Sequence, residues 1–127
     1  MYHTEGMLIS ELAATTGVSV HAIRSYLAEG LIPRAGKTDG GFGLFDRNAV
    51  ERLGIIRLTR QAGLPLQAIR PLLHAMNGKD AIVVATSIEE VERTLQQCRQ
   101  QLAALSAQIL VLRDAASSDD LRRQEVA

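Results

Sequence analysis

Apolar residues in the first third of the chain recur at the spacing of short amphipathic helices separated by glycines. Residues 8–16 form the first segment, with Ser10 as its expected N-cap, and Gly17 ends it. Residues 19–29 form the second, which begins with a capping serine and is followed by Gly30. One apolar stripe follows the second segment: Ile23, Tyr26 and Leu27. Two helices joined by a glycine-containing turn predict a helix-turn-helix unit.

The next stretch alternates between short apolar runs and turn residues. Residues 35–45 contain an Asp-Gly-Gly sequence between two short segments, which predicts a β-hairpin wing; a plain surface loop is the alternative. A third helix follows, capped by Asp46 or Asn48 and running to about Ala62. Its expected apolar face is broad: Val50, Leu53, Ile55, Ile56 and Leu58.

A fourth helix is expected within residues 65–76, where Pro71 predicts a kink or a late start. Residues 79–86 fit either a strand or one more helical turn. Two overlapping capping boxes, Thr86 with Glu89 and Ser87 with Glu90, then predict the start of a long helix.

The long helix carries apolar or nearly apolar residues at alternating intervals of three and four. The positions are Ile88, Val91, Leu95, Cys98, Leu102, Leu105, Ile109 and Leu112. So narrow a seam predicts a coiled-coil dimer, the alternative being that the helix folds back on its own domain. The fold class is therefore mainly α: a winged helix-turn-helix DNA-binding domain over residues 7–78, a coiled-coil dimerisation helix over 86–115, and a disordered tail over 116–127.

The composition of the chain narrows the possible functions without identifying one. The net charge is zero, so DNA binding would require a local basic patch rather than overall charge. A single cysteine, Cys98, excludes an intrachain disulfide, and neither a signal peptide nor a membrane span is expected, which predicts a cytoplasmic protein. No nucleophile–base pair, metal-ligand cluster or phosphate loop is evident, so neither an enzyme nor a cofactor is expected.

The second helix of a helix-turn-helix unit enters the major groove through its N-terminal part. Off its buried stripe lie His21, Ala22, Arg24 and Ser25, and an arginine can bind guanine edges bidentately. The backbone N–H groups at Ser19 and Val20 could hold a phosphate. Backbone contacts from the wing are expected from Arg34, Lys37 and Thr38.

Several of these residues together resemble the MerR family of bacterial transcription regulators. The matching stretches are Gly17-Val18-Ser19-Val20, Ile23-Arg24, Tyr26, Gly30-Leu31, Gly40-Gly41-Phe42 and Leu44-Phe45-Asp46. The resemblance implies a homodimer with an antiparallel coiled coil, bound to double-stranded promoter DNA whose overlong spacer is twisted and bent. It also implies DNA contacts from Arg24, Tyr26 and the wing from Lys37 to Phe42. Within the family, the small coregulators of mercury-resistance operons are most similar.

Departures from the family pattern change what is expected of function. Ser25 replaces an aromatic residue and Gly43 an arginine, which predicts weaker DNA contacts and reliance on a protein partner, either a MerR-type activator or RNA polymerase. No cysteine precedes the long helix or follows it in the tail, so no metal site is expected. Cys98 is expected to be a small core residue, with a redox role as the alternative.

Two functions remain open from the sequence. One is a transcription regulator or coregulator without a metal site. The other is an adaptor that binds another regulator or polymerase, with weak DNA binding of its own.

Overall fold

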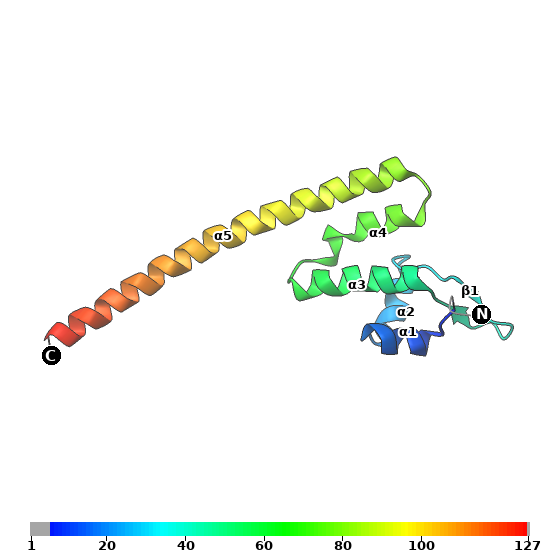
Figure 1. The fold of residues 1–127 in the computed structure, drawn as a ribbon, viewed down its shortest axis with the longest axis horizontal. Coiled ribbons are helices and arrows are strands. Elements are labelled where there is room, and N and C mark those ends of the chain that lie inside the picture. Colours follow the sequence, from blue (N-terminus) through cyan, green and yellow to red (C-terminus); the bar gives the residue numbers. More distant parts are fainter. Residues whose placement is uncertain (1–5, 127) are drawn as a thin grey trace. The chain divides into compact units, whose positions relative to one another are not determined.

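The cap of the first helix lies two residues before the expected Ser10. A computed structural model describes residues 6–126, and its first helix, α1 (Ile9–Thr16), has Leu8 as its N-cap (Figure 1). Glu11 Oε1 accepts a hydrogen bond of 3.0 Å from the Leu8 N–H group. Ser10 therefore lies inside the first turn, and its prediction as the cap is wrong. Glu11 satisfies one of the unpaired N–H groups at the helix start instead.

The second helix of the helix-turn-helix, which we call the recognition helix, is α2 (Val20–Ala28). It has the boundaries that its capping residues predict. Ser19 Oγ accepts a hydrogen bond of 3.1 Å from the Ala22 N–H group. Gly30 follows with a φ of 74°, the left-handed conformation that favours glycine. Ile23 and Tyr26 are buried, which confirms the apolar stripe.

The wing is a two-stranded antiparallel hairpin made of β1 (Gly36–Lys37) and β2 (Gly43–Leu44). Gly36 is paired with Leu44, and Lys37 with Gly43. The turn is closed by the Gly41 N–H group, which donates to the Thr38 carbonyl at 2.9 Å. The predicted wing is thus confirmed over a plain loop.

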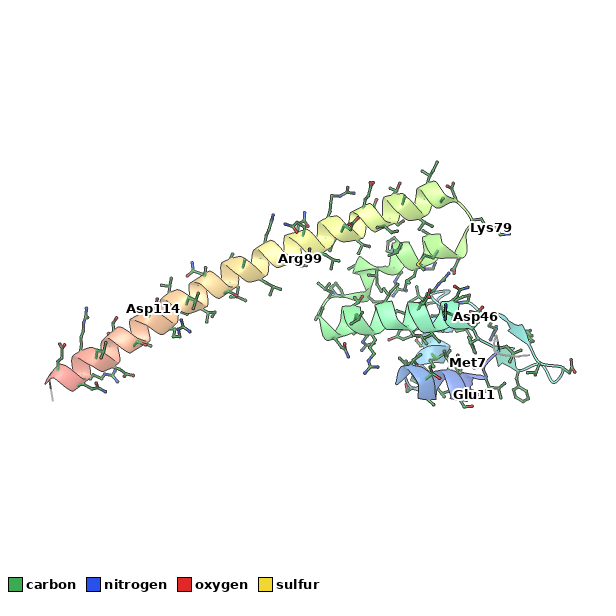
Figure 2. The ribbon with its side chains drawn as sticks, viewed as in Figure 1. Met7, Glu11, Asp46, Lys79, Arg99 and Asp114 are labelled. Atoms are coloured by element: carbon green, nitrogen blue, oxygen red, sulfur yellow. The ribbon has the colours of Figure 1, made fainter. Side chains whose placement is uncertain are left out.

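The third helix, α3 (Arg47–Gln61), is capped by Asp46, whose Oδ1 accepts a hydrogen bond of 2.9 Å from the Asn48 N–H group. Asp46 lies at the start of this helix, as Figure 2 shows. Leu58 is 67% exposed, so its expected place on the buried face of α3 is wrong.

The fourth helical region is divided by its proline. A 3-10 turn, η1 (Leu66–Ala68), precedes α4 (Arg70–Asn77), and Pro71 lies in the first turn of α4. A proline is tolerated at that position because its missing N–H group would have no partner inside the helix. Of the two expectations, the late start holds and the kink does not.

The core of the first part of the chain lies between these helices and the wing. Figure 1 shows α3 between α4 and the α1–α2 pair. The largest fully buried side chains come from every layer: Leu12, Ile23, Leu31, Phe45, Leu53, Ile56 and Leu73.

A group of polar contacts joins α4 to its neighbours. Arg52 is 5% exposed, and its Nη1 donates to Asn77 Oδ1 and to the Leu73 carbonyl. Burial lowers the pKa of Arg52, while the Asp46 carboxylate opposes that shift. Asn77 Nδ2 donates to the Gly30 carbonyl at 2.7 Å, so α4 is fastened to the turn that ends α2.

The long helix, α5 (Ala81–Val126), begins before the predicted capping boxes. Asp80 Oδ1 accepts a hydrogen bond of 2.9 Å from the Ile82 N–H group at its start. Thr86 Oγ1 instead donates to the Ile82 carbonyl at 2.9 Å, and Ser87 is buried within the helix. Both predicted capping boxes are therefore wrong, and the ambiguous residues from 81 onward are helical.

The same helix continues through Val126, so the tail expected to be disordered over residues 116–127 is helical up to that residue. Ala127 lies outside the described residues. The chain divides into two units after Val91, inside α5 rather than between elements. Several seam positions in the second unit are exposed in the single chain: Leu102, Leu105, Ile109 and Leu112. None of the helices described has an apolar stretch long enough to cross a membrane.

Candidate nucleic-acid interface

The outward face of α2 carries the side chains expected to meet DNA. His21, Arg24 and Ser25 are exposed, while Ala22 is half-buried at the edge of this face. At the start of the helix, Ser19 is exposed and Val20 is half-buried. The cap at Ser19 fixes where the helix starts and so determines which side chains face outward.

Tyr26 differs from the other candidates because it belongs to the core. It is 7% exposed, and its Oη accepts a hydrogen bond of 2.9 Å from Arg60 Nη1. The ring therefore helps to fix α2 against α3 in this conformation. The burial of Tyr26 agrees with the apolar stripe predicted from the sequence. It agrees less well with the DNA contact that the resemblance implies.

Three wing residues expected at DNA have separate roles in the hairpin. Lys37 is exposed on β1, and Phe42 is 69% exposed. Thr38 Oγ1 accepts a hydrogen bond of 3.0 Å from the Phe42 N–H group, so Thr38 also holds the turn together.

Arg34 and Gly43 lie against each other on the two sides of the wing. A Cβ atom placed on Gly43 would lie 3.0 Å from Nε of Arg34, a tight contact that would require the Arg34 side chain to shift slightly. The absence of a side chain at position 43 thus allows the Arg34 side chain to lie close against the backbone of the wing. The Arg34 guanidinium therefore places one positive charge beside Gly43.

A hollow of about 460 Å³ lies between α1, α2 and the wing. Arg24 of α2 and Arg34 of the wing both line it, so two cations from separate elements face one space. The other side chains around it are largely apolar: Leu8, Ile9, Leu27, Phe42 and Phe45. This arrangement suits a phosphate backbone that passes between helix and wing.

A second hollow, of about 300 Å³, lies where the turn between α1 and α2 meets α3. Arg57 and Arg60 line it, and neither residue was among the candidates from the sequence. The sequence prediction for α3 named only its apolar positions. Two arginines three residues apart on a helix share a face, and that spacing is the signal that could have identified Arg57 and Arg60.

The comparisons with known proteins agree with this architecture. A family model described as MerR HTH family regulatory protein matches residues 7–76. The HTH-type transcriptional regulator MerD of Shigella flexneri is 38% identical over 101 residues, which cover 80% of this chain and 84% of that protein.

Solved structures show the same fold. The transcription regulator PbrR691 from Ralstonia metallidurans, in complex with lead(II), matches with a TM-score of 0.52 and 28% identity, covering 84% of this chain and 85% of that one. HiNmlR, a MerR family regulator lacking the sensor domain and bound to promoter DNA, matches with a TM-score of 0.57 and 19% identity, covering 88% and 94%.

Proposed function

Because this chain belongs to the MerR family of helix-turn-helix regulatory proteins, we propose that it binds a promoter operator as a homodimer, without a metal-sensing site. It is a MerR-type transcriptional regulator, like the MerD proteins to which it is similar. The MerD relative is named as an HTH-type transcriptional regulator. The structurally similar HiNmlR is a family member bound to promoter DNA.

The observation that carries DNA binding is the hollow shared by Arg24 and Arg34. Arg24 projects from the recognition helix, from which side chains can reach base edges in the major groove. Arg34 lies on the wing, from which cations contact backbone phosphates. The Arg34 guanidinium beside Gly43 leaves the wing with a cation, which supports DNA binding by this chain itself.

Dimerisation is proposed through α5, within residues 86–115. A helix that leaves Leu102, Leu105 and Ile109 more than half exposed has apolar area to bury against a second copy. The spacing of the seam supports a coiled coil, in which two recognition helices would match the two halves of a symmetric operator.

Arg24→Ala tests the recognition helix. We expect the variant to lose about 5- to 150-fold of its preference for the operator over random DNA, because one bidentate arginine–guanine contact discriminates by about 1–3 kcal/mol. Fluorescence anisotropy on both duplexes measures this. Arg93→Ala, an exposed arginine of α5, removes the same charge elsewhere and should bind as the wild type does.

A gel shift tests the function as a whole. The purified protein is mixed with its own upstream region and with a mercury-resistance promoter, with and without a MerR-type activator. Specific, salt-sensitive binding by the protein alone is the expected result. Binding only when the activator is present would replace this proposal with a coregulator that depends on a partner, and no binding in either case would refute it.

A further inference from the structure

Two oppositely charged residues lie beside the seam of α5, near its two ends. Glu92 directly follows the seam residue Val91, and Arg113 directly follows Leu112. We propose that Glu92 of one copy pairs with Arg113 of a second copy, and that this pair selects both the partner chain and the register in which the two helices meet. The inference rests on the proposed function, because it assumes that two copies of α5 associate along the seam.

Neither charge has an ion-pair partner in its own chain. Both side chains are exposed, and among the residues that the structure describes neither forms a salt bridge. Ion pairs along a helix join residues three or four positions apart. The residues at those distances from Arg113 are uncharged, and the charged residue at those distances from Glu92 is Glu89, which repels it. Both charges are therefore left for a group on another molecule.

The seam is symmetric about Gln100, so two antiparallel copies can pair all of its positions with one another. In that register each seam residue faces a seam residue of the second copy. Ile88 faces the partner's Leu112, Val91 the partner's Ile109, Leu95 the partner's Leu105, and Cys98 the partner's Leu102.

The same register brings Glu92 close to the partner's Arg113. Each of these residues directly follows a three-residue interval of the seam, 88–91 or 109–112, so both lie on the same flank of an antiparallel pair. The partner's Gln108 is opposite Glu92, and Arg113 lies five residues, or about 7.5 Å, further along the axis. Helical side chains lean toward the N-terminus of their own helix, so in antiparallel helices these two lean toward each other. The two-fold symmetry of a homodimer repeats the pair at the other end of the seam.

Other arrangements of the same seam bring like charges together or leave the charges unpaired. If the antiparallel copies are shifted by one heptad in one direction, Arg99 meets the partner's Arg99, and in the other direction it meets the partner's Arg113. In a parallel pair, Glu92 faces the partner's Ser87 and Arg113 faces the partner's Gln108, which are both uncharged. Repulsion between like charges disfavours the shifted registers, so the charges specify the symmetric antiparallel one.

The same charges discriminate between partner chains. A foreign helix with a matching apolar seam but without an arginine and a glutamate at this spacing would leave Glu92 and Arg113 unpaired. A second copy of this chain supplies both groups at once. The surface therefore fits a homodimer better than a mixed dimer with a helix of different charge pattern.

Charge reversal tests the pair. Glu92→Arg places two arginines together in its homodimer, and Arg113→Glu places two glutamates together. Because two attractive pairs become repulsive in each case, the dissociation constant of each homodimer should rise about tenfold, and less at high salt. Sedimentation equilibrium at several salt concentrations measures this change.

Mixing the two variants should reverse the loss. In the mixed dimer, the arginine introduced at position 92 of one chain faces the glutamate introduced at position 113 of the other, and the natural Arg113 and Glu92 still pair. Native mass spectrometry distinguishes the mixed dimer from the two homodimers by mass, and the mixed dimer should predominate. The double variant Glu92→Arg/Arg113→Glu should form a homodimer of wild-type strength for the same reason.

Arg93→Glu is the matched control, because it reverses an exposed charge on the side of α5 opposite the seam and should leave the dissociation constant unchanged. Circular dichroism shows whether each variant is as helical as the wild type. A monomeric wild type would refute the proposed dimer itself. A wild-type dimer whose two reversal variants dimerise normally, or fail to prefer each other when mixed, would refute only the pairing of Glu92 with Arg113.

Discussion

Single residues in the wing show how two positions can share one role. Gly43 taken alone indicates a missing charge, and Arg34 taken alone indicates an ordinary surface cation. In the structure the Arg34 side chain lies so close to Gly43 that a side chain at position 43 would have to displace it. This relation depends on the cross-strand register, in which Lys37 is paired with Gly43. A pattern that treats positions one at a time cannot reveal it, although each residue was identified from the sequence.

The substitutions Arg34→Ala and Gly43→Arg, made singly and together, test whether a cation at either position can fill the same role. Arg34→Ala should lower the slope of log DNA affinity against log salt by about 0.9, and the double variant should recover it. Gly43→Arg alone should gain less than it gains in the Arg34→Ala background, because two arginines compete for the same space. Equal gains in both backgrounds would mean that the positions act independently, contrary to this expectation.

At the scale of elements, local capping signals predicted the boundaries of α2 and α4 but not the starts of α1 and α5. Ser19 and Gly30 mark the two ends of α2, and Pro71 predicts the late start of α4. Each of these residues affects only the backbone within a few residues of itself. The start of α5 was missed because Asp80 caps the helix earlier. The capping-box pattern, a serine or threonine with a glutamate three residues later, can also occur in the interior of a helix. The pattern alone therefore does not locate the start of a helix.

The middle of α3 offers a test of these backbone preferences. Gly54 is helical, and a Cβ atom there would meet nothing within 4 Å. Gly54→Ala should therefore raise the free energy of unfolding by about 0.5–1 kcal/mol, because alanine has the higher helix propensity. Urea unfolding followed by circular dichroism measures the change.

Gly63 is the matched control, since its surroundings are equally open but its φ is 77°. Gly63→Ala should lower the free energy of unfolding by about 1 kcal/mol, because alanine is strained in that conformation. If both variants shifted in the same direction, side-chain hydration rather than backbone conformation would control the effect.

At the scale of the whole molecule, the apolar seam of α5 is left largely uncovered by the single chain. Val91 packs against the core of the first unit, whereas Leu102 is 63% exposed. The heptad spacing could be predicted from sequence because it is one-dimensional. What covers the seam depends on a second molecule, and the proposed dimer is the simplest occupant.

Leu102→Asp should convert the dimer into monomers. Burying a carboxylate in an apolar seam costs several kcal/mol of binding free energy. The dissociation constant of the dimer should therefore rise more than about a hundredfold. Sedimentation velocity gives the mass directly. Leu110→Asp makes the same change at an exposed leucine outside the seam and should remain dimeric; if it also dissociates, the interface lies on a different face of α5.

The contacts between α4 and the end of α2 have a consequence for signalling. Arg70 Nη1 lies 2.6 Å from Glu29 Oε1, and Asn77 holds the Gly30 carbonyl. Both bonds need close distances, so α4 cannot slide past α2 by a fraction of a turn and keep them. A displacement of α4 must either break this latch or move the C-terminal end of the recognition helix with it. These two contacts thus couple the position of α4 to the C-terminal end of the recognition helix.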